Sequence, residues 1–280
     1  MLPELTFRML LETDWRLLAR FAGTFGLKGA ASLRRFRRRL REGKQFPPFL
    51  FISITSACNL RCQGCWVDVR GPVRQLSVEK LDEIVVGAKR RGVRFFGLLG
   101  GEPLLHEGLL DVLGRHRDCF FQVFTNGMLM TDSLAREFRR LGNVTPLVSI
   151  EGLERVSDVR RGGRDVFSRT LGGLEACRRH RLITGVATSL CRSNIEDLLS
   201  ADFVHRLIDL RVHYLWYYVY RPVGPTPTPE LSLSAEQLRR ARRFIVRTRT
   251  WAPLLIVDAY WDADGRPICP AAAGISYRSE

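Results

Sequence analysis

The feature that most constrains the fold is a regular alternation of apolar runs and amphipathic segments between residues 49 and 220. Six short runs have the composition of buried β-strands, and five of them are separated from the next by a stretch of helical periodicity. The predicted strands are 49–55, 94–99, 119–125, 145–151, 183–190 and 213–220, and the predicted helices are 77–92, 106–117, 131–141, 165–181 and 194–209.

Apolar strands that alternate with helices indicate a parallel sheet with right-handed crossovers. The pattern is compatible with an open doubly wound sheet or with a partial barrel, and both place ligands at the carboxyl ends of the strands. Four distinctive segments follow strand ends: a cysteine loop after 49–55, GGEP at 100–103, FTNG at 124–127 and VSIEG at 148–152. We therefore expect these segments to meet on one face.

Composition restricts the protein class. The chain has 280 residues and seven cysteines, an odd number unevenly spread along it. This argues against a secreted disulfide framework and favours reduced thiols in a cytosol. Charges interrupt the first apolar stretch, which excludes a signal-peptide core, and no run approaches the roughly 18 to 20 apolar residues of a spanning helix. We expect a cytoplasmic protein, with a peripheral position at a membrane as an alternative.

The charge balance is strongly basic, with a formal net charge of +15. Such a balance suits nucleic acid, an anionic membrane or an acidic substrate, and an arginine-rich genome is the plain alternative. Residues 1–47 are the most basic segment, and Leu33, Phe36 and Leu40 recur there at helical spacing. The pattern predicts an amphipathic helix that lies on a membrane, binds RNA, or packs on the domain with its arginines in solvent.

The cysteine loop has the spacing C-x3-C-x2-C, formed by Cys58, Cys62 and Cys65 within CNLRCQGC. Thiolates this close on one loop can point at one metal centre. Structural zinc usually takes a fourth protein ligand, whereas a four-iron cluster takes about one thiolate per iron. Three cysteines would leave one iron open for a substrate or cofactor. A zinc loop or redox-sensitive thiols are the alternatives.

With this loop, the chain resembles the radical S-adenosylmethionine (radical SAM) superfamily, whose hallmark is the same spacing. The resemblance covers residues 49–221 and implies a partial (βα)6 barrel of parallel strands. It implies a [4Fe–4S] cluster on the three cysteines, whose open iron binds the amino and carboxylate groups of S-adenosylmethionine. Reductive cleavage then yields a 5′-deoxyadenosyl radical that takes a hydrogen atom from the substrate. A low-potential donor such as flavodoxin or ferredoxin would supply the electron.

The other motifs fit the same resemblance. The family uses GGEP for the methionine amino group of the cofactor, and glycines let backbone carbonyls approach an ammonium closely. An arginine fork suits a carboxylate. The candidate cofactor-binding residues implied by the resemblance are Gly100, Gly101, Glu102, Pro103, Asn126, Ser149, Arg161 and Asn194. Plain turns and solvent-exposed loop charge are the alternative interpretation of these segments.

Two positions depart from the family pattern. Many members carry an aromatic residue just before the third cysteine, near adenine, whereas this chain has Gly64 there and Trp66 just after Cys65. Glu151 stands where related enzymes with SPASM-type C-terminal modules have aspartate. The first departure leaves the packing around adenine open.

The last part of the chain begins with a Pro-rich connector at 221–230, followed by a predicted helix at 234–250 and an apolar run at 253–259. Cys269 resembles the start of an auxiliary-cluster module of the SPASM/twitch-type branch, and no cysteine follows it. We expect a truncated or degenerate module. The predicted division is a basic helical N-terminal extension (1–47), a radical SAM core (48–221) and a linker, helix and partial SPASM-like tail (222–280).

The sequence thus predicts a radical SAM enzyme with an unidentified substrate. The SPASM-like features favour a peptide or protein, and the basic charge keeps RNA and anionic lipid as alternatives. A non-catalytic iron–sulfur or zinc-binding protein is the competing hypothesis, which has no use for S-adenosylmethionine or for the GGEP segment.

Overall fold

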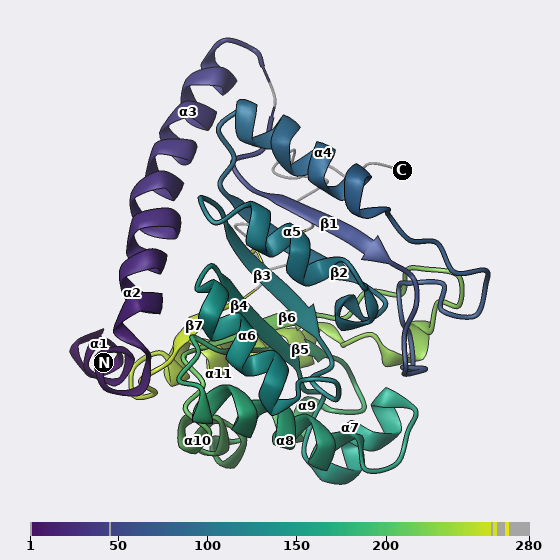
Figure 1. The fold of residues 1–280 in the computed structure, drawn as a ribbon. Helices are drawn as coiled ribbons and strands as arrows, with labels where there is room; N and C mark the ends of the chain where they lie inside the picture. Colours follow the sequence, from purple (N-terminus) through teal and green to yellow (C-terminus); the bar gives the residue numbers. More distant parts are fainter. Residues whose placement is uncertain (1, 45, 259, 262–266, 269–280) are drawn as a thin grey trace.

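The computed structural model describes the chain except for residues 1, 45, 259, 262–266 and 269–280. Within the described residues, one parallel sheet contains seven strands whose order follows the chain (Figure 1). Its strands are β1 (Leu50–Thr55), β2 (Phe95–Gly100), β3 (Phe120–Thr125), β4 (Val144–Ser149), β5 (Gly185–Leu190), β6 (Tyr214–Val219) and β7 (Leu255–Val257). Strands β8 (Tyr260–Trp261) and β9 (Pro267–Ile268) form a separate antiparallel pair.

The strand order selects between the two architectures that the sequence allowed. A doubly wound sheet reverses its order at a switch point, whereas each strand here pairs in parallel with the next one along the chain. The partial barrel of parallel strands is therefore confirmed. The structure adds a seventh strand, because the apolar run predicted at 253–259 contains β7, which pairs with β6 from Tyr214 and Leu255 onward.

Helices cover the outer face of the sheet, as the crossover rule predicts. In α4 (Val78–Arg90), the Ser77 side chain caps the amino end by accepting from Lys80 N–H, and Leu81 and Val85 are fully buried. The other helices of this part are α5 (Leu109–Arg115), α6 (Asp132–Leu141), α7 (Glu154–Arg161), α8 (Val166–Arg179), α9 (Ile195–Leu198), α10 (Ala201–Asp209), α11 (Ala235–Thr248) and the 3₁₀ turns η2 (Pro103–Leu105) and η3 (Pro229–Leu231).

Side chains alternate across the sheet with a period of two. Phe121 and Val123 of β3 point into the core beneath the outer helices. Phe124 lies on the other face, here called the inner face, where its ring contacts Phe51 of β1 and Trp216 of β6 at centroid distances of 5.7 and 6.2 Å. The inner face is therefore lined by aromatic rings.

The N-terminal extension is helical, in α1 (Leu2–Glu12), α2 (Trp15–Phe21), a π-helical stretch η1 (Ala22–Lys28) and α3 (Gly29–Arg41), with α2, η1 and α3 following one another without a break. It packs against the inner face near the amino ends of the strands. Phe21 meets Phe120, the first residue of β3, edge-on at 5.1 Å, and Leu17 is buried. Arg20 donates to the carbonyl of Leu141.

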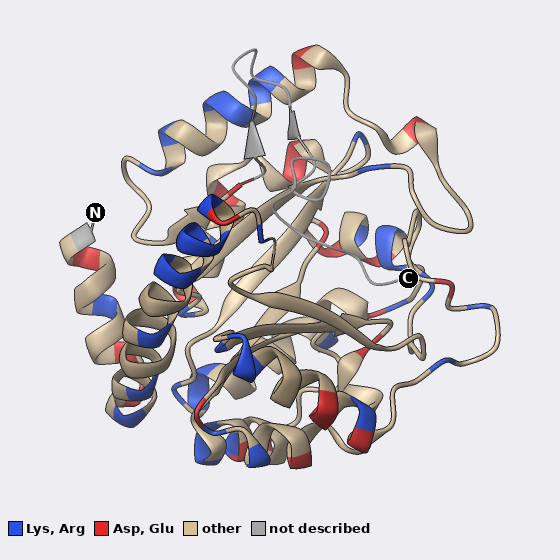
Figure 2. Ribbon diagram, turned by 90° about the horizontal axis from the view of Figure 1, so that it is seen from above, with Lys and Arg blue, Asp and Glu red and all other residues tan. Residues whose placement is uncertain are grey.

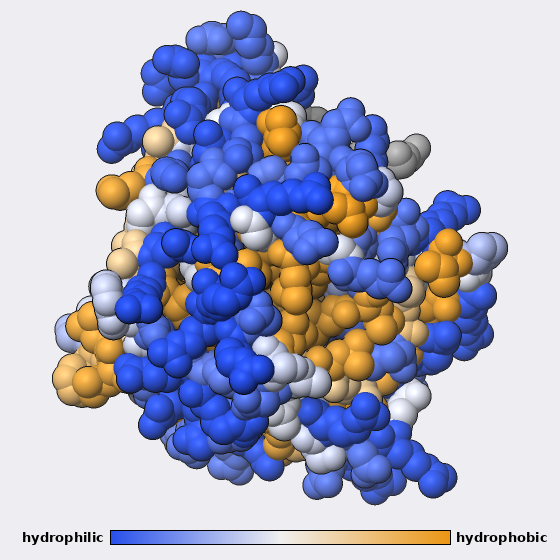
Figure 3. All heavy atoms as spheres, viewed as in Figure 1, coloured by the Kyte–Doolittle hydropathy of each residue, from blue (hydrophilic) through white to orange (hydrophobic). Residues whose placement is uncertain are grey.

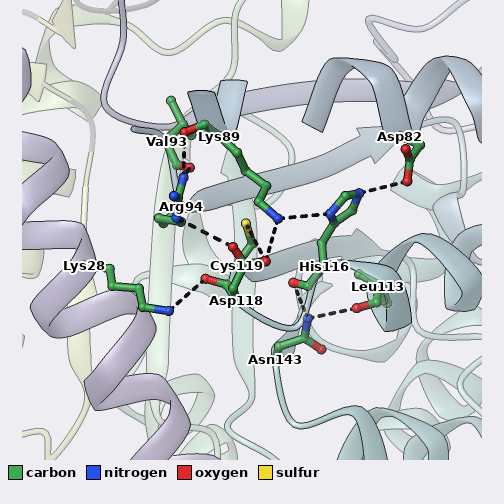
Figure 4. A network of polar contacts seen from close by, with 10 residues as sticks. All are labelled: Lys28, Asp82, Lys89, Val93, Arg94, Leu113, His116, Asp118, Cys119 and Asn143. Carbon is green, nitrogen blue, oxygen red and sulfur yellow. Dashed lines mark hydrogen bonds and ion pairs between the residues drawn. The ribbon is translucent and has the colours of Figure 1, made fainter. Parts of the chain in front are cut away.

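A polar network also holds the extension to the core (Figure 4). Lys28 donates to the backbone carbonyl of Asp118, whose carboxylate accepts from Lys89 at 2.7 Å. His116 lies 3.5 Å from Lys89 and 3.0 Å from Asp82. Burial and the neighbouring Lys89 cation lower the pKa of His116. The network joins η1, α4 and the segment before β3, so the end of η1 has a defined position on the core.

The predicted basic helix is α3, and its apolar side chains are only partly buried. Phe36 is half-buried, but Leu33 and Leu40 remain 40% and 42% exposed. No helix in the described ranges combines the length and apolar character needed to cross a membrane. The boundaries 1–47, 48–221 and 222–280 stay predictions, and Cys269 lies outside the described residues.

Candidate active site

The cysteine loop leaves the carboxyl end of β1 and leads into α4 (Figure 1). Cys58, Cys62 and Cys65 are half-buried free thiols. The buried side chain of Leu60 anchors the loop, and its backbone N–H donates to the Cys58 sulfur at 3.4 Å. Gln63 exchanges two hydrogen bonds with Arg160, one from its backbone N–H and one to its carbonyl. The loop is therefore fixed at both its centre and its far side.

The three thiols influence one another electrostatically. Burial, together with the neighbouring Cys62 and Cys65, raises the pKa of Cys58 to about 11. Burial also raises the pKa of Cys65, with Cys62 acting in the same direction. The described residues contain no group of three His, Cys, Asp or Glu side chains that could hold a single metal ion. A four-iron cluster does not need such a group, because each thiolate binds a different iron.

The Gly100–Gly101 turn ends β2 against the start of the cysteine loop. Gly101 N–H donates to the Thr55 carbonyl and Glu102 N–H to the Ala57 carbonyl, both at 2.7 Å. A Cβ at Gly100 would collide with the Thr55 carbonyl oxygen, and one at Gly101 with that of Ala57. Gly100 also has a φ of +147°. Only glycine fits this close backbone contact.

Glu102 is fully buried and connects two strand ends. One carboxylate oxygen accepts from Leu104 N–H and the other from Asn126 N–H, at 3.0 and 2.7 Å. Burial raises its pKa. Pro103 is buried beside it as the first residue of η2. In this arrangement the carboxylate orders the turn after β2 and the turn after β3.

Asn126 follows β3 and lies beside the cysteine loop. Its amide group donates to the Asn59 side chain at 2.7 Å, and its side-chain oxygen accepts from Met128 N–H. The Asn126 carbonyl accepts from Thr170. The residue is therefore more than a turn former, because it joins the loop after β3 to the cysteine loop itself.

Arg161 is the buried cation that contacts the cysteine loop through the sulfur of Cys62. It ends α7, and its Nη1 lies 3.6 Å from the Cys62 sulfur. Its Nη2 is 3.8 Å from Glu151 and has no hydrogen-bond partner among the described residues. Burial opposes the charge, yet Cys62 and Glu151 raise the pKa of Arg161 above its usual value. Arg160 is buried as well, and Glu151 lies 3.9 Å from it.

Asn194 and Ser149 complete the set of predicted residues. The Asn194 amide donates to Glu151 and to the Ser189 carbonyl, and its oxygen accepts from Cys191 N–H. Asn194 therefore reaches the cysteine loop only through Glu151 and the arginines. Ser149 is half-buried at the end of β4, where it pairs with Ala187. The structure thus places the glycine turn, Asn126 and Arg161 each in contact with the cysteine loop or the residues that lead into it. Asn194 contacts Glu151, which in turn lies beside Arg161.

Gly64 has a partner that the sequence did not indicate. Its φ is +65°, and a Cβ there would collide with the hydroxyl of Tyr220, which follows β6. Tyr220 is buried, and its hydroxyl accepts from Thr228 N–H at 3.3 Å. A Cβ at Gly224 would lie 2.8 Å from the Cα of Trp66. The Pro-rich connector therefore packs on the cysteine loop, and a tyrosine ring lies directly beside Gly64.

A protein-family model described as the radical SAM superfamily matches residues 52–203, more than half of the chain. The chain belongs to the radical SAM superfamily. The cofactors of this family are a [4Fe–4S] cluster and S-adenosylmethionine, and its members are enzymes. The predicted family is thereby confirmed.

Relatives of this radical SAM chain are longer than the matched region. Fe-coproporphyrin III synthase of Methanosarcina barkeri is 25% identical over 240 residues, which span 80% of this chain and 58% of the relative. The sporulation killing factor maturation protein SkfB of Bacillus subtilis is 27% identical over 150 residues, or 52% of this chain and 37% of SkfB. The chain spans less than two thirds of each.

Among solved structures, Streptococcus suis SuiB bound to its precursor peptide SuiA has a TM-score of 0.69 with this chain. The sequence identity is 18%, and the match covers 82% of this chain and 53% of SuiB. This likeness establishes the fold of the chain.

Sequence reasoning missed several residues that shape the site. In the sequence Asn59 is part of the cysteine motif and Tyr220 is the last residue of a predicted strand, and neither pattern indicates the contacts that these side chains make. Gly162 has a φ of +66° and packs on the Arg61 carbonyl, where a Cβ would collide. The sequence signal for this contact is that a glycine, Gly162, directly follows the Arg160–Arg161 pair.

Proposed function

We propose that this chain is a radical SAM enzyme in which Cys58, Cys62 and Cys65 hold a [4Fe–4S] cluster. The observation that carries the proposal is the meeting of three half-buried thiols with the buried Arg161 guanidinium and the Gly100–Gly101 turn at the strand ends. The cluster would supply the electron for reductive cleavage of S-adenosylmethionine, which provides the radical chemistry that abstracts a hydrogen atom from the substrate.

The donor set suits such a cluster. Thiolate is the ligand that iron–sulfur clusters take, and three thiols lie on one loop. Other cysteines of the described part of the chain, Cys119 and Cys177, are fully buried in the main hydrophobic core. Three protein ligands suit a cluster that keeps one iron for an exchangeable ligand.

The surrounding residues suit the polar groups of S-adenosylmethionine. Both Glu102 oxygens already accept backbone hydrogen bonds, so we assign the ammonium to carbonyls near Gly100 and Gly101, with Glu102 and Pro103 ordering the turn. The buried Nη2 of Arg161 is a donor that suits the cofactor carboxylate.

The remaining residues have supporting roles in this proposal. Asn126 holds the cysteine loop through Asn59, Ser149 lies at the end of β4, and Asn194 positions Glu151 beside Arg161. A low-potential protein such as a flavodoxin or ferredoxin would donate the electron.

A peptide or protein is the substrate that we favour. SkfB is a maturation protein, and SuiB was crystallised with a precursor peptide. The inner face offers partly exposed aromatic rings, with Phe51 of β1 37% exposed and Tyr218, close to the carboxyl end of β6, 39% exposed. These rings suit a large apolar side chain brought to the cofactor.

A tetrapyrrole is a second candidate substrate. The same rings, together with Phe124 and Trp216, form a continuous aromatic surface on which a flat conjugated molecule can stack. The match to Fe-coproporphyrin III synthase covers most of this chain. Absorption titration with iron coproporphyrin, compared with titration of Trp216→Ala, would distinguish this substrate from a peptide.

The enzymatic proposal is tested by anaerobic reconstitution with iron and sulfide, followed by dithionite and S-adenosylmethionine. We expect 5′-deoxyadenosine and methionine as products, and loss of both products and most of the iron in Cys62→Ala. Cys177→Ala removes a thiol outside the loop and is the matched control, which should keep its iron. Full iron loading without any cleavage of S-adenosylmethionine would favour a non-catalytic iron–sulfur protein instead, and bound zinc a zinc-binding one.

A further inference from the structure

The N-terminal helices expose large apolar side chains to solvent. Trp15 of α2 and Leu27 of η1 are 70% and 77% exposed, and Phe7, Leu10 and Leu11 of α1 are about as exposed. In Figure 3, hydrophobic side chains gather at the lower left, over α1, and continue along the left edge of the molecule. Several adjoining exposed apolar residues indicate an interaction surface, whereas single ones do not.

Basic side chains border this apolar surface. A groove of about 650 Å³ runs along α2 and η1 between Trp15 and Leu27. Its charged lining residues are all cations: Arg16, Arg20, Lys28 and Arg117. Residues 1–47 contain eleven Lys and Arg against four Asp and Glu, although α1 itself has Arg8 against Glu4 and Glu12. In the whole chain Lys and Arg outnumber Asp and Glu 44 to 29, and Figure 2 shows where both kinds lie on the described fold. The partner must therefore offer both negative charge and apolar material.

The surface is held outward on the core. The Phe21–Phe120 contact and the Arg20 and Lys28 hydrogen bonds fix α2 and η1 on the core, so Trp15 and Leu27 cannot turn inward. Between them, a Cβ added at Gly23 or Gly26 would meet no other atom within 4 Å. A broad, flat partner can therefore approach the helix along its length.

We propose that the N-terminal helices dock this protein on an anionic phospholipid surface. Phe7, Leu10, Leu11, Trp15 and Leu27 enter the interface between headgroups and acyl chains, and Arg16 and Arg117 of the groove contact lipid phosphates. RNA would use the cations, but it offers no acyl phase for the aliphatic side chains of α1 and η1. Lipid is therefore the partner that satisfies both halves of the surface.

The docking surface lies away from the candidate active site. The helices contact the first residues of strands, such as Phe120, whereas the cysteine loop follows the last residues of β1. In Figure 1 the N-terminal helices lie on the left and the cysteine loop on the right. Docking thus leaves the loops at the strand ends facing the aqueous side, where a soluble substrate can reach them.

The test is flotation of the full chain with phosphatidylcholine vesicles that contain or lack phosphatidylglycerol, across a salt series. We expect binding that needs phosphatidylglycerol and weakens as salt rises. The double variant Trp15→Ser and Leu27→Ser should lower the partition coefficient by about tenfold or more, and Arg16→Glu with Arg117→Glu by about thirtyfold or more.

Matched controls come from α11, where Val246 and Arg243 are exposed on the described surface. Val246→Ser and Arg243→Glu should bind vesicles as the parent does, and circular dichroism should show that every variant is folded. The proposal is overturned if vesicles are not bound, or if the Trp15 and Leu27 variant binds them unchanged. It is also overturned if that variant instead abolishes binding to RNA or dissociates a dimer.

Discussion

The close contact between the Gly100–Gly101 turn and the cysteine loop makes a quantitative prediction. In Gly101→Ala the new methyl group meets the carbonyl oxygens of Ala57 and Ser56, which belong to the backbone and cannot rotate away. The turn must move, and the hydrogen bonds from Gly101 N–H to Thr55 and from Glu102 N–H to Ala57 lengthen or break.

The expected loss of stability is the sum of two contributions, the weakened hydrogen bonds and the steric overlap of the new methyl group. Loss of two backbone hydrogen bonds costs roughly 1 kcal/mol each, and an overpacked methyl group adds about 1–3 kcal/mol. We expect Gly101→Ala to lower the free energy of unfolding by about 3–5 kcal/mol. Because the same contact fixes the start of the cysteine loop, the variant should also take up less iron on reconstitution.

The matched control is Gly172→Ala, the same chemical change in helix α8 with open space around the new methyl group. Removing a helical glycine should stabilise the protein by about 0.5–1 kcal/mol. Urea unfolding of both variants, followed by circular dichroism, gives the comparison. If Gly101→Ala unfolded at the same urea concentration as Gly172→Ala, the close-contact argument would be refuted.

Three further predictions concern single contacts. Glu102→Gln should lower the free energy of unfolding by about 1–3 kcal/mol in urea titrations, because one buried N–H loses its acceptor; no change would contradict the assigned bonds. Gly64→Ala should lower the melting temperature, and Tyr220→Ala should recover part of that loss in the double variant, whereas additive losses would exclude the contact. Burial lowers the pKa of His213 to about 4. The unfolded chain therefore binds a proton at this residue before the folded protein does, and the free energy of unfolding falls by about 3 kcal/mol between about pH 6.5 and pH 4. In His213→Asn the free energy of unfolding should depend less steeply on pH over this range, as measured by urea unfolding at a series of pH values.

Much of the fold was predictable because local chemistry and the tertiary structure agree. Each predicted strand from 49–55 to 213–220 overlaps an observed strand, and Ser77 begins a helix as a capping residue should. β7 was read only as an apolar run, because three residues carry too little periodicity to assign a strand. The strand order, which depends on pairing between segments far apart in sequence, required the structure.

The candidate site was predictable to the level of motifs. The sequence placed the cysteine loop and the 100–103 segment at strand ends, and the structure brings them into contact. The packing of Tyr220 beside Gly64 was not predictable, because it depends on how the connector after β6 returns over the loop. The role of Glu102 in ordering the turns after β2 and β3 was not predictable either, because it depends on the two backbone N–H groups that its carboxylate binds.

The basic helix shows the limit of pattern reasoning. Leu33, Phe36 and Leu40 share a spacing that predicts one buried face, yet two of them remain substantially exposed. Periodicity indicates which residues share a face, but not which partner covers it. The cations along α2 and η1, together with the exposed apolar residues of α1 and η1, favour lipid as the partner of the N-terminal helices.

The most direct test of the account is electron paramagnetic resonance of anaerobically reconstituted, dithionite-reduced protein before and after addition of S-adenosylmethionine. We predict a four-iron signal that changes when the cofactor binds and that is absent from Cys58→Ala, while Cys119→Ala retains both the signal and its response. A protein that bound zinc, or an iron signal that S-adenosylmethionine left unaltered, would contradict the assignment of the three cysteines.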